Sequence, residues 1–299
     1  MYNGYKVKIF IFAGRETTMS LLMPQLNDPI IDEIIIAKNT NNKNDLAYLN
    51  SLAGKFDKIR YIELPVAIKN NPHAAWKYLY KFMQDKGTIY IKMDDDVIFV
   101  KPGYFHKTVQ FKVEHPEYLC VFPVIVNNPY ICTLLKVHPL MFGTKLMSKW
   151  QMMNAYFYHG DIGADLHDLF LKTPNSNIWK IDNHTFGPEA VQWSDSKHPH
   201  NVTAMVPWSY AERMGINSMC YIGDDFNKID VAKKIESCYS DELFLMYNIF
   251  DYSPNMKHYI IGDTLVSHFA FSGQRGLRER TDILNRYKSL IKDTYGISC

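Results

Sequence analysis

The sequence predicts an α/β fold in which a Rossmann-like, mostly parallel sheet is flanked by helices. Over the first hundred residues, β-rich runs alternate with segments of helical spacing, and the connections between them are short. The composition, 47% hydrophobic and 21% charged, is that of a globular protein and excludes a disordered or fibrous chain. Because no linker or internal repeat divides the 299 residues, we expect a single domain over residues 1–299.

The predicted strands of the first part are rich in β-branched and aromatic residues, and they lie at residues 6–13, 30–38, 59–64 and 88–93. Apolar residues recur every three or four positions between them, which predicts helices at residues 18–26, 45–53 and 73–86. Strands joined through helices by right-handed crossovers form a parallel sheet. The first hundred residues therefore predict a parallel sheet with helices packed on it.

The pattern is looser after residue 100. Strands are predicted at residues 118–126, 218–222 and 263–271, and helices at residues 145–158, from Asp241 onward and at residues 277–295. Residues 159–207 are rich in His, Pro, Asn and Asp and have no sustained period, which indicates loops that cover a site. We therefore expect an irregular second half.

Polar residues follow the predicted parallel strands at their carboxyl ends, which is where such sheets bind ligands. Gly14 and Arg15 follow the first strand, Asn39 follows the second, and three aspartates follow the fourth. No GxGxxG follows the first strand and no GxxxxGK[ST] occurs, which disfavours a dinucleotide-binding site and a P-loop.

The run Asp94-Asp95-Asp96 lies between apolar, strand-forming residues and is the most informative stretch. Adjacent carboxylates repel one another unless a cation or water screens them. In an extended segment Asp94 and Asp96 point the same way and can converge on one Mg²⁺ or Mn²⁺ ion. The alternative is an acidic turn between two strands.

An alternating α/β start followed by an apolar-DDD-apolar run near residue 95 resembles the GT-A fold glycosyltransferases. In that family the DxD motif binds a nucleotide-sugar diphosphate through a metal ion. The resemblance implies a Mn²⁺ or Mg²⁺ cofactor, a UDP- or GDP-sugar donor, and a glycan or other hydroxyl acceptor. It places nucleotide-sugar binding in residues 1–100 and acceptor binding in residues 101–299, with inversion at the anomeric carbon as the simpler outcome.

The resemblance also suggests site residues. The metal ligands would be Asp94, Asp96 and His268, the last in the run Asp263-Thr264-Leu265-Val266-Ser267-His268. Donor binding would fall to Phe12, Ala13, Gly14, Arg15, Asn39, Lys77, Lys92, Asp94 and Asp95. For His268, the alternative is a buried core histidine, and for Arg15 it is a solvated loop charge.

Candidate general bases are Asp241 and Glu242, an acidic pair that opens a predicted helix behind Ser240. The same pair can simply complement the helix dipole at that end. Asp225, in the run Gly223-Asp224-Asp225 after a strand, is the rival base. Four arginines lie near the C-terminus: Arg275, Arg278, Arg280 and Arg286. They could bind a diphosphate or an anionic membrane, and the alternative is a solvated helix face.

Charge and apolar patterning exclude several function classes. A net charge of +2 gives no electrostatic footprint for nucleic acid. No apolar run approaches the ~18 residues of a transmembrane segment, and the first apolar run is predicted to be a strand rather than a signal peptide. Five widely spaced cysteines favour a reducing compartment, so we expect a cytoplasmic protein. The open alternatives are a sugar nucleotidyltransferase and a non-catalytic carbohydrate-binding protein.

Overall fold

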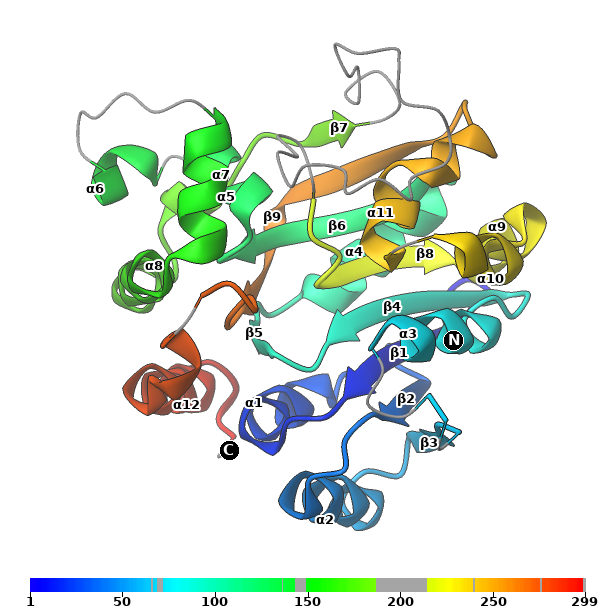
Figure 1. Ribbon diagram of the computed structural model, residues 1–299, viewed down its shortest axis with the longest axis horizontal. Coiled ribbons are helices and arrows are strands. Elements are labelled where there is room, and N and C mark those ends of the chain that lie inside the picture. The colour runs from blue at the N-terminus through cyan, green and yellow to red at the C-terminus, as the bar shows by residue number, and fades with distance from the viewer. Residues whose placement is uncertain are drawn as a thin grey trace.

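A single nine-stranded sheet runs through the computed structural model, which describes residues 1–65, 67–68, 72–135, 137–142, 149–186, 214–238, 240–274 and 276–297 (Figure 1). Its strands are β1 (Lys6–Ala13), β2 (Glu33–Lys38), β3 (Ile59–Glu63), β4 (Thr88–Asp94), β5 (Val97–Val100), β6 (Tyr118–Val126), β7 (His184–Phe186), β8 (Ser218–Ile222) and β9 (Lys257–His268).

The order of strands in the sheet is β3-β2-β1-β4-β8-β6-β9-β5, and β7 pairs with β9. The first four strands are parallel, as the alternation of strands and helices predicted. β8 is antiparallel to both β4 and β6, whereas β6 and β9 are parallel. The predicted α/β fold class is confirmed, with the antiparallel pairs confined to the second half of the sheet.

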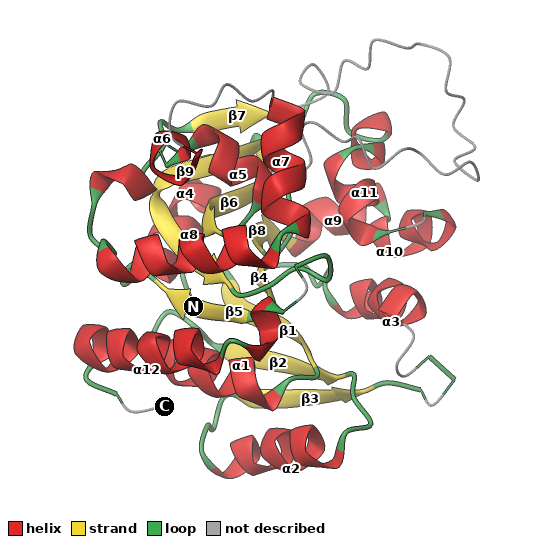
Figure 2. Cartoon of the chain, turned by 60° about the vertical axis from the view of Figure 1, so that its left-hand side comes forward, coloured by secondary structure: helices red, strands yellow, loops and turns green. Residues whose placement is uncertain are grey.

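Helices cover the sheet and its ends. They are α1 (Glu16–Leu22), α2 (Lys43–Ser51), α3 (Pro72–Leu79), α4 (Tyr104–Glu114), α5 (Pro129–Leu134), α6 (His138–Phe142), α7 (Lys149–Tyr158), α8 (Gly160–Lys172), α9 (Gly223–Ile229), α10 (Val231–Lys234), α11 (Asp241–Met246) and α12 (Thr281–Tyr295). Short 3₁₀ turns extend several of them: η1 (Met23–Leu26), η2 (Leu52–Gly54), η3 (Tyr80–Phe82), η4 (Asn177–Trp179), η6 (Ile235–Ser237), η7 (Asn248–Asp251) and η8 (Leu277–Glu279). Figure 2 shows α8, α1 and α12 in front of the strands, and α4 packs against β6, β8 and β9.

Strands from both halves of the chain begin or end side by side at one end of the sheet. β1 and β4 end together, since Phe12 pairs with Asp94. β8 runs the other way, so its first residue, Ser218, lies opposite Met93. β6 and β9 also finish at this end because β6 is parallel to β4. The register of the sheet thus brings residues near 14, 94, 127, 217 and 268 to one place.

The second half is more regular than the sequence predicted. The prediction of loops at residues 159–207 is wrong for the described part of this range, which contains α8, η4 and β7. Leu166, Leu169 and Phe170 do recur at helical spacing, but glycines near the start of α8 obscure the pattern. Gly163 is needed there because a Cβ would lie 2.7 Å from Gln274 Nε2. Residues 187–207 lie outside the described residues.

Other boundaries differ from the predictions for local reasons. β9 begins at Lys257 rather than at residue 263, because its first part pairs with β6 and β7. The helix predicted at residues 145–158 is described from Lys149, and residues 143–148 lie outside the described residues. Within the described part of the chain, no helix has the length and apolar character that a membrane span requires.

A buried histidine ties β9 to α11. His258 is fully buried, its Nε2 lies 2.8 Å from the carbonyl oxygen of Leu245, and its ring packs against Phe122, Phe186 and Phe250. Burial lowers the pKa of His258 to about 4, partly offset by the Leu245 carbonyl and reinforced by the charge of Lys112. The imidazole is therefore neutral in the folded protein near neutral pH.

We expect the folded state to lose stability as the pH falls from the unfolded histidine pKa of about 6.5 toward 4. In that window the unfolded chain binds a proton at His258 that the folded chain does not, a loss of up to about 3 kcal/mol. His258→Gln, which retains an N–H donor, should flatten this dependence. Urea unfolding between pH 4.5 and 8 measures it, and parallel curves for the two proteins would contradict the assignment.

Candidate functional site

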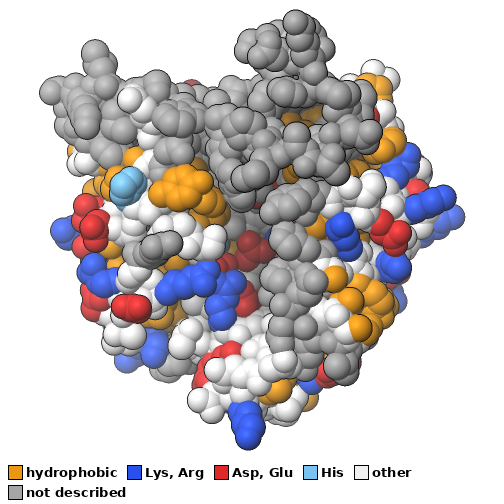
Figure 3. Space-filling view, viewed as in Figure 1, with side chains coloured by type: hydrophobic (Ala, Val, Ile, Leu, Met, Phe, Trp, Pro, Cys, Tyr) orange, Lys and Arg blue, Asp and Glu red, His pale blue; other side chains and the backbone are white. Residues whose placement is uncertain are grey.

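A cavity of about 320 Å³ opens where the strand ends meet. Figure 3 shows Asp and Glu side chains in a hollow near the centre of this face, beside Lys or Arg side chains. The cavity is lined by residues from both halves of the chain: Phe10, Phe12, Arg15, Trp76, Leu79, Tyr80, Met83, Lys92, Asp94, Asp96, Ile216, Asn217, Asp241, Glu242, His268, Ala270, Phe271, Ser272 and Arg278. Carboxylates, cations and an imidazole thus share one hollow with an aromatic wall.

Asp94 is the last residue of β4, and chain groups hold both of its carboxylate oxygens. Lys92 Nζ donates to Oδ1 at 2.5 Å, and Asn217 Nδ2 donates to Oδ2 at 3.0 Å. The ammonium of Lys92 also donates to the carbonyl of Ile216 at 2.9 Å. Burial opposes the charge of Lys92, but Asp94 and Asp241 outweigh it and raise the lysine pKa. Lys92 is therefore a fixed cation beneath the acidic residues.

Arg15 joins the end of β1 to the other two aspartates. Its guanidinium forms ion pairs with Asp95 and, at 2.6 Å, with Asp96 Oδ2. The backbone N–H of Gly14 donates to Asp95 Oδ2 at 2.7 Å. Burial raises the pKa of Asp95 to about 6, against the attraction of Arg15. Burial acts the same way on Asp96, but His268 and Arg15 hold its pKa well below the usual range. Asp96 is thus a carboxylate at neutral pH.

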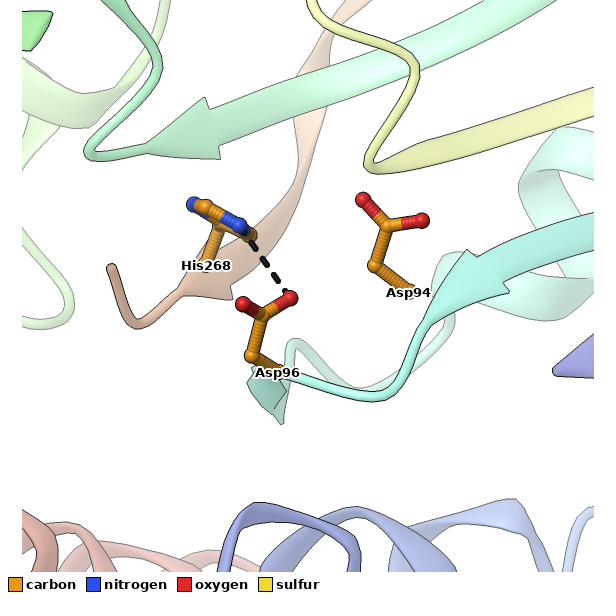
Figure 4. Close-up of side chains that lie close together, drawn as sticks. All are labelled: Asp94, Asp96 and His268. Carbon is orange, nitrogen blue, oxygen red and sulfur yellow. Dashed lines mark ion pairs between the residues drawn. The ribbon is translucent and has the colours of Figure 1, made fainter. Parts of the chain in front are cut away.

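His268 reaches Asp96 because β5 and β9 are antiparallel. Val97 pairs with His268, and the N–H of Phe269 donates to the carbonyl of Asp96 at 2.8 Å. His268 Nε2 then lies 3.2 Å from Asp96 Oδ1, and the imidazole is 3% exposed. Figure 4 shows the Asp94 carboxylate facing the same space from the end of β4.

These three side chains fit a divalent cation. One ligand atom from each of Asp94, Asp96 and His268 can be chosen so that all lie within 4.8 Å of one another. Two buried polar atoms in this group, Asp96 Oδ1 and His268 Nδ1, have no hydrogen-bond partner. Carboxylate oxygen with one imidazole nitrogen is a donor set that suits Mn²⁺ better than Mg²⁺. Asp96 Oδ1 thus faces His268 Nε2, 3.2 Å away, whereas both oxygens of Asp94 accept hydrogen bonds from Lys92 and Asn217.

The acidic pair of α11 lies on the cavity wall. Ser240 caps the helix by accepting a hydrogen bond from the N–H of Leu243 at 3.1 Å, as its position in the sequence indicated. Asp241 accepts from Tyr80 OH at 3.4 Å and from the N–H of Glu242 at 2.9 Å. Burial raises the pKa of Asp241, Lys92 lowers it, and Asp94 raises it again, so that the net direction is upward. Both carboxylates therefore face the same hollow as the candidate metal ligands.

A network of side-chain amides fixes the turn after β9. Asn127, which has a positive φ of 63°, donates to the carbonyl of Phe269 at 2.8 Å. Gln274 donates to Asn127 Oδ1 and to the carbonyl of Tyr156, both at 2.7 Å, and accepts from the N–H of Phe271 at 2.9 Å. This turn holds Ala270, Phe271 and Ser272 against the cavity.

Some residues predicted for the site lie elsewhere. The prediction that Asp225 lies at the site is corrected. Ile222 pairs with Ile89, which places the start of α9 at the opposite end of β4 from Asp94. Its carboxylate lies 3.4 Å from the buried ammonium of Lys112. Lys77 turns away from the cavity and donates to the carbonyl of Glu236 at 2.8 Å.

Three residues predicted around the donor shape the end of β1. Phe12 lines the cavity, whereas Ala13 is buried. Asn39 donates its N–H to the carbonyl of Ala13 at 2.7 Å, and a Cβ on Gly14 would lie 2.9 Å from the carbonyl oxygen of Asn39. The backbones of Ala13, Gly14 and Asn39 therefore join the ends of β1 and β2.

Sequence reasoning missed Asn217 and Tyr80. Asn217 precedes β8 directly, and a polar residue just before a buried strand was the available signal. Tyr80 belongs to an apolar helical pattern, so nothing in the sequence separates it from core residues. Trp76, which was also compatible with the core, is 9% exposed and lines the cavity.

No family model and no curated protein matches this chain. Solved structures do resemble it. The structure of GalNAc-T7 with UDP, GalNAc and Mn²⁺ matches with a TM-score of 0.50 and 10% identity, over 96% of this chain and 50% of that one. The 4-diphosphocytidyl-2C-methyl-D-erythritol synthase of Anaerococcus prevotii DSM 20548 matches with a TM-score of 0.47 and 13% identity, over 96% and 97%. S. aureus TarS (residues 1–349) matches at 0.44 and 11%, over 97% and 66%.

At these identities the likeness concerns the fold. The chain spans about half the length of the GalNAc-T7 structure that it matches. The GalNAc-T7 structure, which matches with a TM-score of 0.50, carries this likeness, and the mostly parallel sheet flanked by helices agrees with it. The chain therefore has the GT-A fold.

Proposed function

We propose that this protein is a metal-dependent glycosyltransferase that moves a sugar from a nucleoside-diphosphate donor to a hydroxyl group of a glycan or other acceptor. The proposal is carried by one observation: Asp94, Asp96 and His268 converge in a cavity that Asp241 and Glu242 also line. Cation ligands on one side and a candidate base on the other are the two parts that such a transfer needs.

On the donor side, Asp96 and His268 would hold the cation, and Asp94 would complete the group. Bound there, Mn²⁺ or Mg²⁺ acts as a Lewis acid that neutralises the departing diphosphate. Lys92 pairs with the Asp94 carboxylate and fixes its orientation, and Arg15 does the same for Asp95 and Asp96. Arg15 is consequently a partner of the acidic residues, and its guanidinium is already engaged.

On the acceptor side, Asp241 is the proposed base. An acceptor hydroxyl attacks the anomeric carbon while its proton passes to the Asp241 carboxylate, and the bond from that carbon to the diphosphate breaks. The upward direction of the Asp241 pKa makes its carboxylate a better proton acceptor than an exposed aspartate. A single displacement of this kind inverts the anomeric configuration.

The chain says least about the nucleobase of the donor, so we propose both UDP- and GDP-sugars. The GalNAc-T7 structure contains UDP, GalNAc and Mn²⁺, which makes UDP-sugars the first to test. A cytoplasmic location remains our proposal for the protein.

A thermal-shift screen of UDP-, GDP- and CMP-sugars, with Mn²⁺ or with EDTA, tests the proposal, because a ligand that binds only the folded state raises the apparent melting temperature. We expect stabilisation by one donor class that requires Mn²⁺, followed by release of the nucleoside diphosphate on incubation with acceptor. Pyrophosphate release from a nucleoside triphosphate and a sugar phosphate would instead identify a nucleotidyltransferase. Glycan binding without any nucleotide effect would identify a binding protein.

The two metal-site aspartates should differ in their effect on metal affinity. Asp96→Asn removes the negative charge of the carboxylate that faces His268 and should weaken Mn²⁺ binding by more than the ~10–100-fold typical of an outer-sphere partner. Asp94→Asn should fall within that range. Asp95→Asn is the matched control, because it also breaks an Arg15 ion pair but removes no ligand. Mn²⁺ titration monitored by electron paramagnetic resonance measures all three, and equal affinities for the Asp94 and Asp96 variants would reject this division.

For the base, Asp241→Asn should lower kcat by roughly 10²–10⁴-fold with little change in donor binding. Glu242→Gln should have a smaller effect, and Asp225→Asn, at the other end of β4, should leave kcat per folded molecule unchanged. Single-turnover rates and donor affinity, measured on the same preparations, separate the two roles. A large loss in Glu242→Gln alone would move the base to that residue, and full activity in both variants would rule out the pair.

A further inference from the structure

The cavity holds more negative than positive charge before any donor enters. Four carboxylates line it and Asp95 lies beside it, whereas the fixed cations are Arg15 and Lys92. Among the described residues, acidic side chains therefore outnumber these two fixed cations at the cavity. A nucleotide-sugar adds the negative charges of its diphosphate. The donor therefore requires a further cation.

Arg15 and Lys92 are not available for this purpose. The guanidinium of Arg15 already binds Asp95 and Asp96, and the ammonium of Lys92 binds Asp94 and the carbonyl of Ile216. Breaking either pair would leave a carboxylate at the cavity wall without its opposite charge. Both cations stay with the acidic residues when the donor arrives.

Arg278 is placed differently. It lies in η8, where the neighbouring Leu277 is buried and anchors the turn, while the Arg278 side chain is exposed and lines the cavity. Gly276, with φ of 79°, allows the tight turn that precedes η8. In the described part of the chain the Arg278 guanidinium forms no hydrogen bond or ion pair.

Two neighbouring arginines are already paired, and Arg275 lies outside the described residues. Arg280 donates to both carboxylate oxygens of Asp282, at 2.8 and 2.9 Å, and Arg286 pairs with Asp168. Neither lines the cavity. Of these three described C-terminal arginines, Arg278 is the one that faces the site with a free guanidinium, whose planar fork matches phosphate oxygens in pairs.

We propose that Arg278 binds the diphosphate of the donor and of the departing nucleoside diphosphate. This inference rests on the proposed function. Asp96 and His268 hold the cation on the sheet side, and Arg278 supplies the second positive group from the C-terminal side of the same cavity. Arg278 thereby adds a positive group that can face the phosphate oxygens of the donor.

Equilibrium binding of UDP and GDP in the presence of Mn²⁺ tests this. Arg278→Ala should weaken binding of the favoured diphosphate roughly 10–100-fold, as for the loss of a charged hydrogen bond. Arg278→Lys should recover part of that loss. Affinity for the free nucleoside, and for Mn²⁺ without nucleotide, should not change. Arg280→Ala is the matched control, an exposed arginine nearby whose partner is Asp282, and it should bind like the wild type.

The outcomes separate this inference from the proposed function. If Arg278→Ala binds UDP or GDP as tightly as the wild type does, the role of Arg278 is overturned and the proposed function still stands. Equal losses in Arg278→Ala and Arg280→Ala also overturn it, because a general effect of surface charge would explain both. If the wild type binds neither nucleotide with Mn²⁺, the proposed function fails and this inference fails with it.

Discussion

Mutual repulsion among carboxylates is the constraint on which this site depends. Asp94, Asp95 and Asp96 follow one another at the end of β4, and Asp241 faces them from α11. Such a group is tolerated in a buried place only when cations compensate it. Arg15 from the end of β1 and Lys92 from within β4 provide this compensation through the ion pairs described above. The two cations hold these carboxylates in place through ion pairs at the wall of the cavity.

The sheet converts this electrostatic arrangement into a geometric one. Parallel pairing of β1 with β4 brings Arg15 to the aspartates, and antiparallel pairing of β5 with β9 brings His268 to Asp96. The antiparallel β8 delivers Asn217 to Asp94 from the other direction. Each of these contacts depends on backbone register, so a shift of one residue would turn the side chain to the other face of the sheet.

Much of this arrangement could be predicted from the sequence, because it follows from local patterns. The limits of β1, β6 and β8 follow from their apolar runs. Parallel sheets bind ligands at the carboxyl ends of their strands, which points to Asp94 and Asp96 as candidates for a ligand site. The contact of Arg15 with Asp95 and Asp96 was not predictable, since it depends on which strands are neighbours. The position of Asp225 was mistaken for the same reason, because nothing local shows that β8 runs antiparallel to β4.

The separation of the metal-site residues along the chain has a consequence for folding. Asp96 lies near the end of the first third of the sequence and His268 near the end of the last third, and the β5–β9 ladder is what joins them. A chain in which β9 has not yet paired with β5 therefore lacks the complete candidate cation site. A cation bound by both segments would cross-link the chain between Asp96 and His268. The affinity for that cation would therefore report whether β9 has paired with β5.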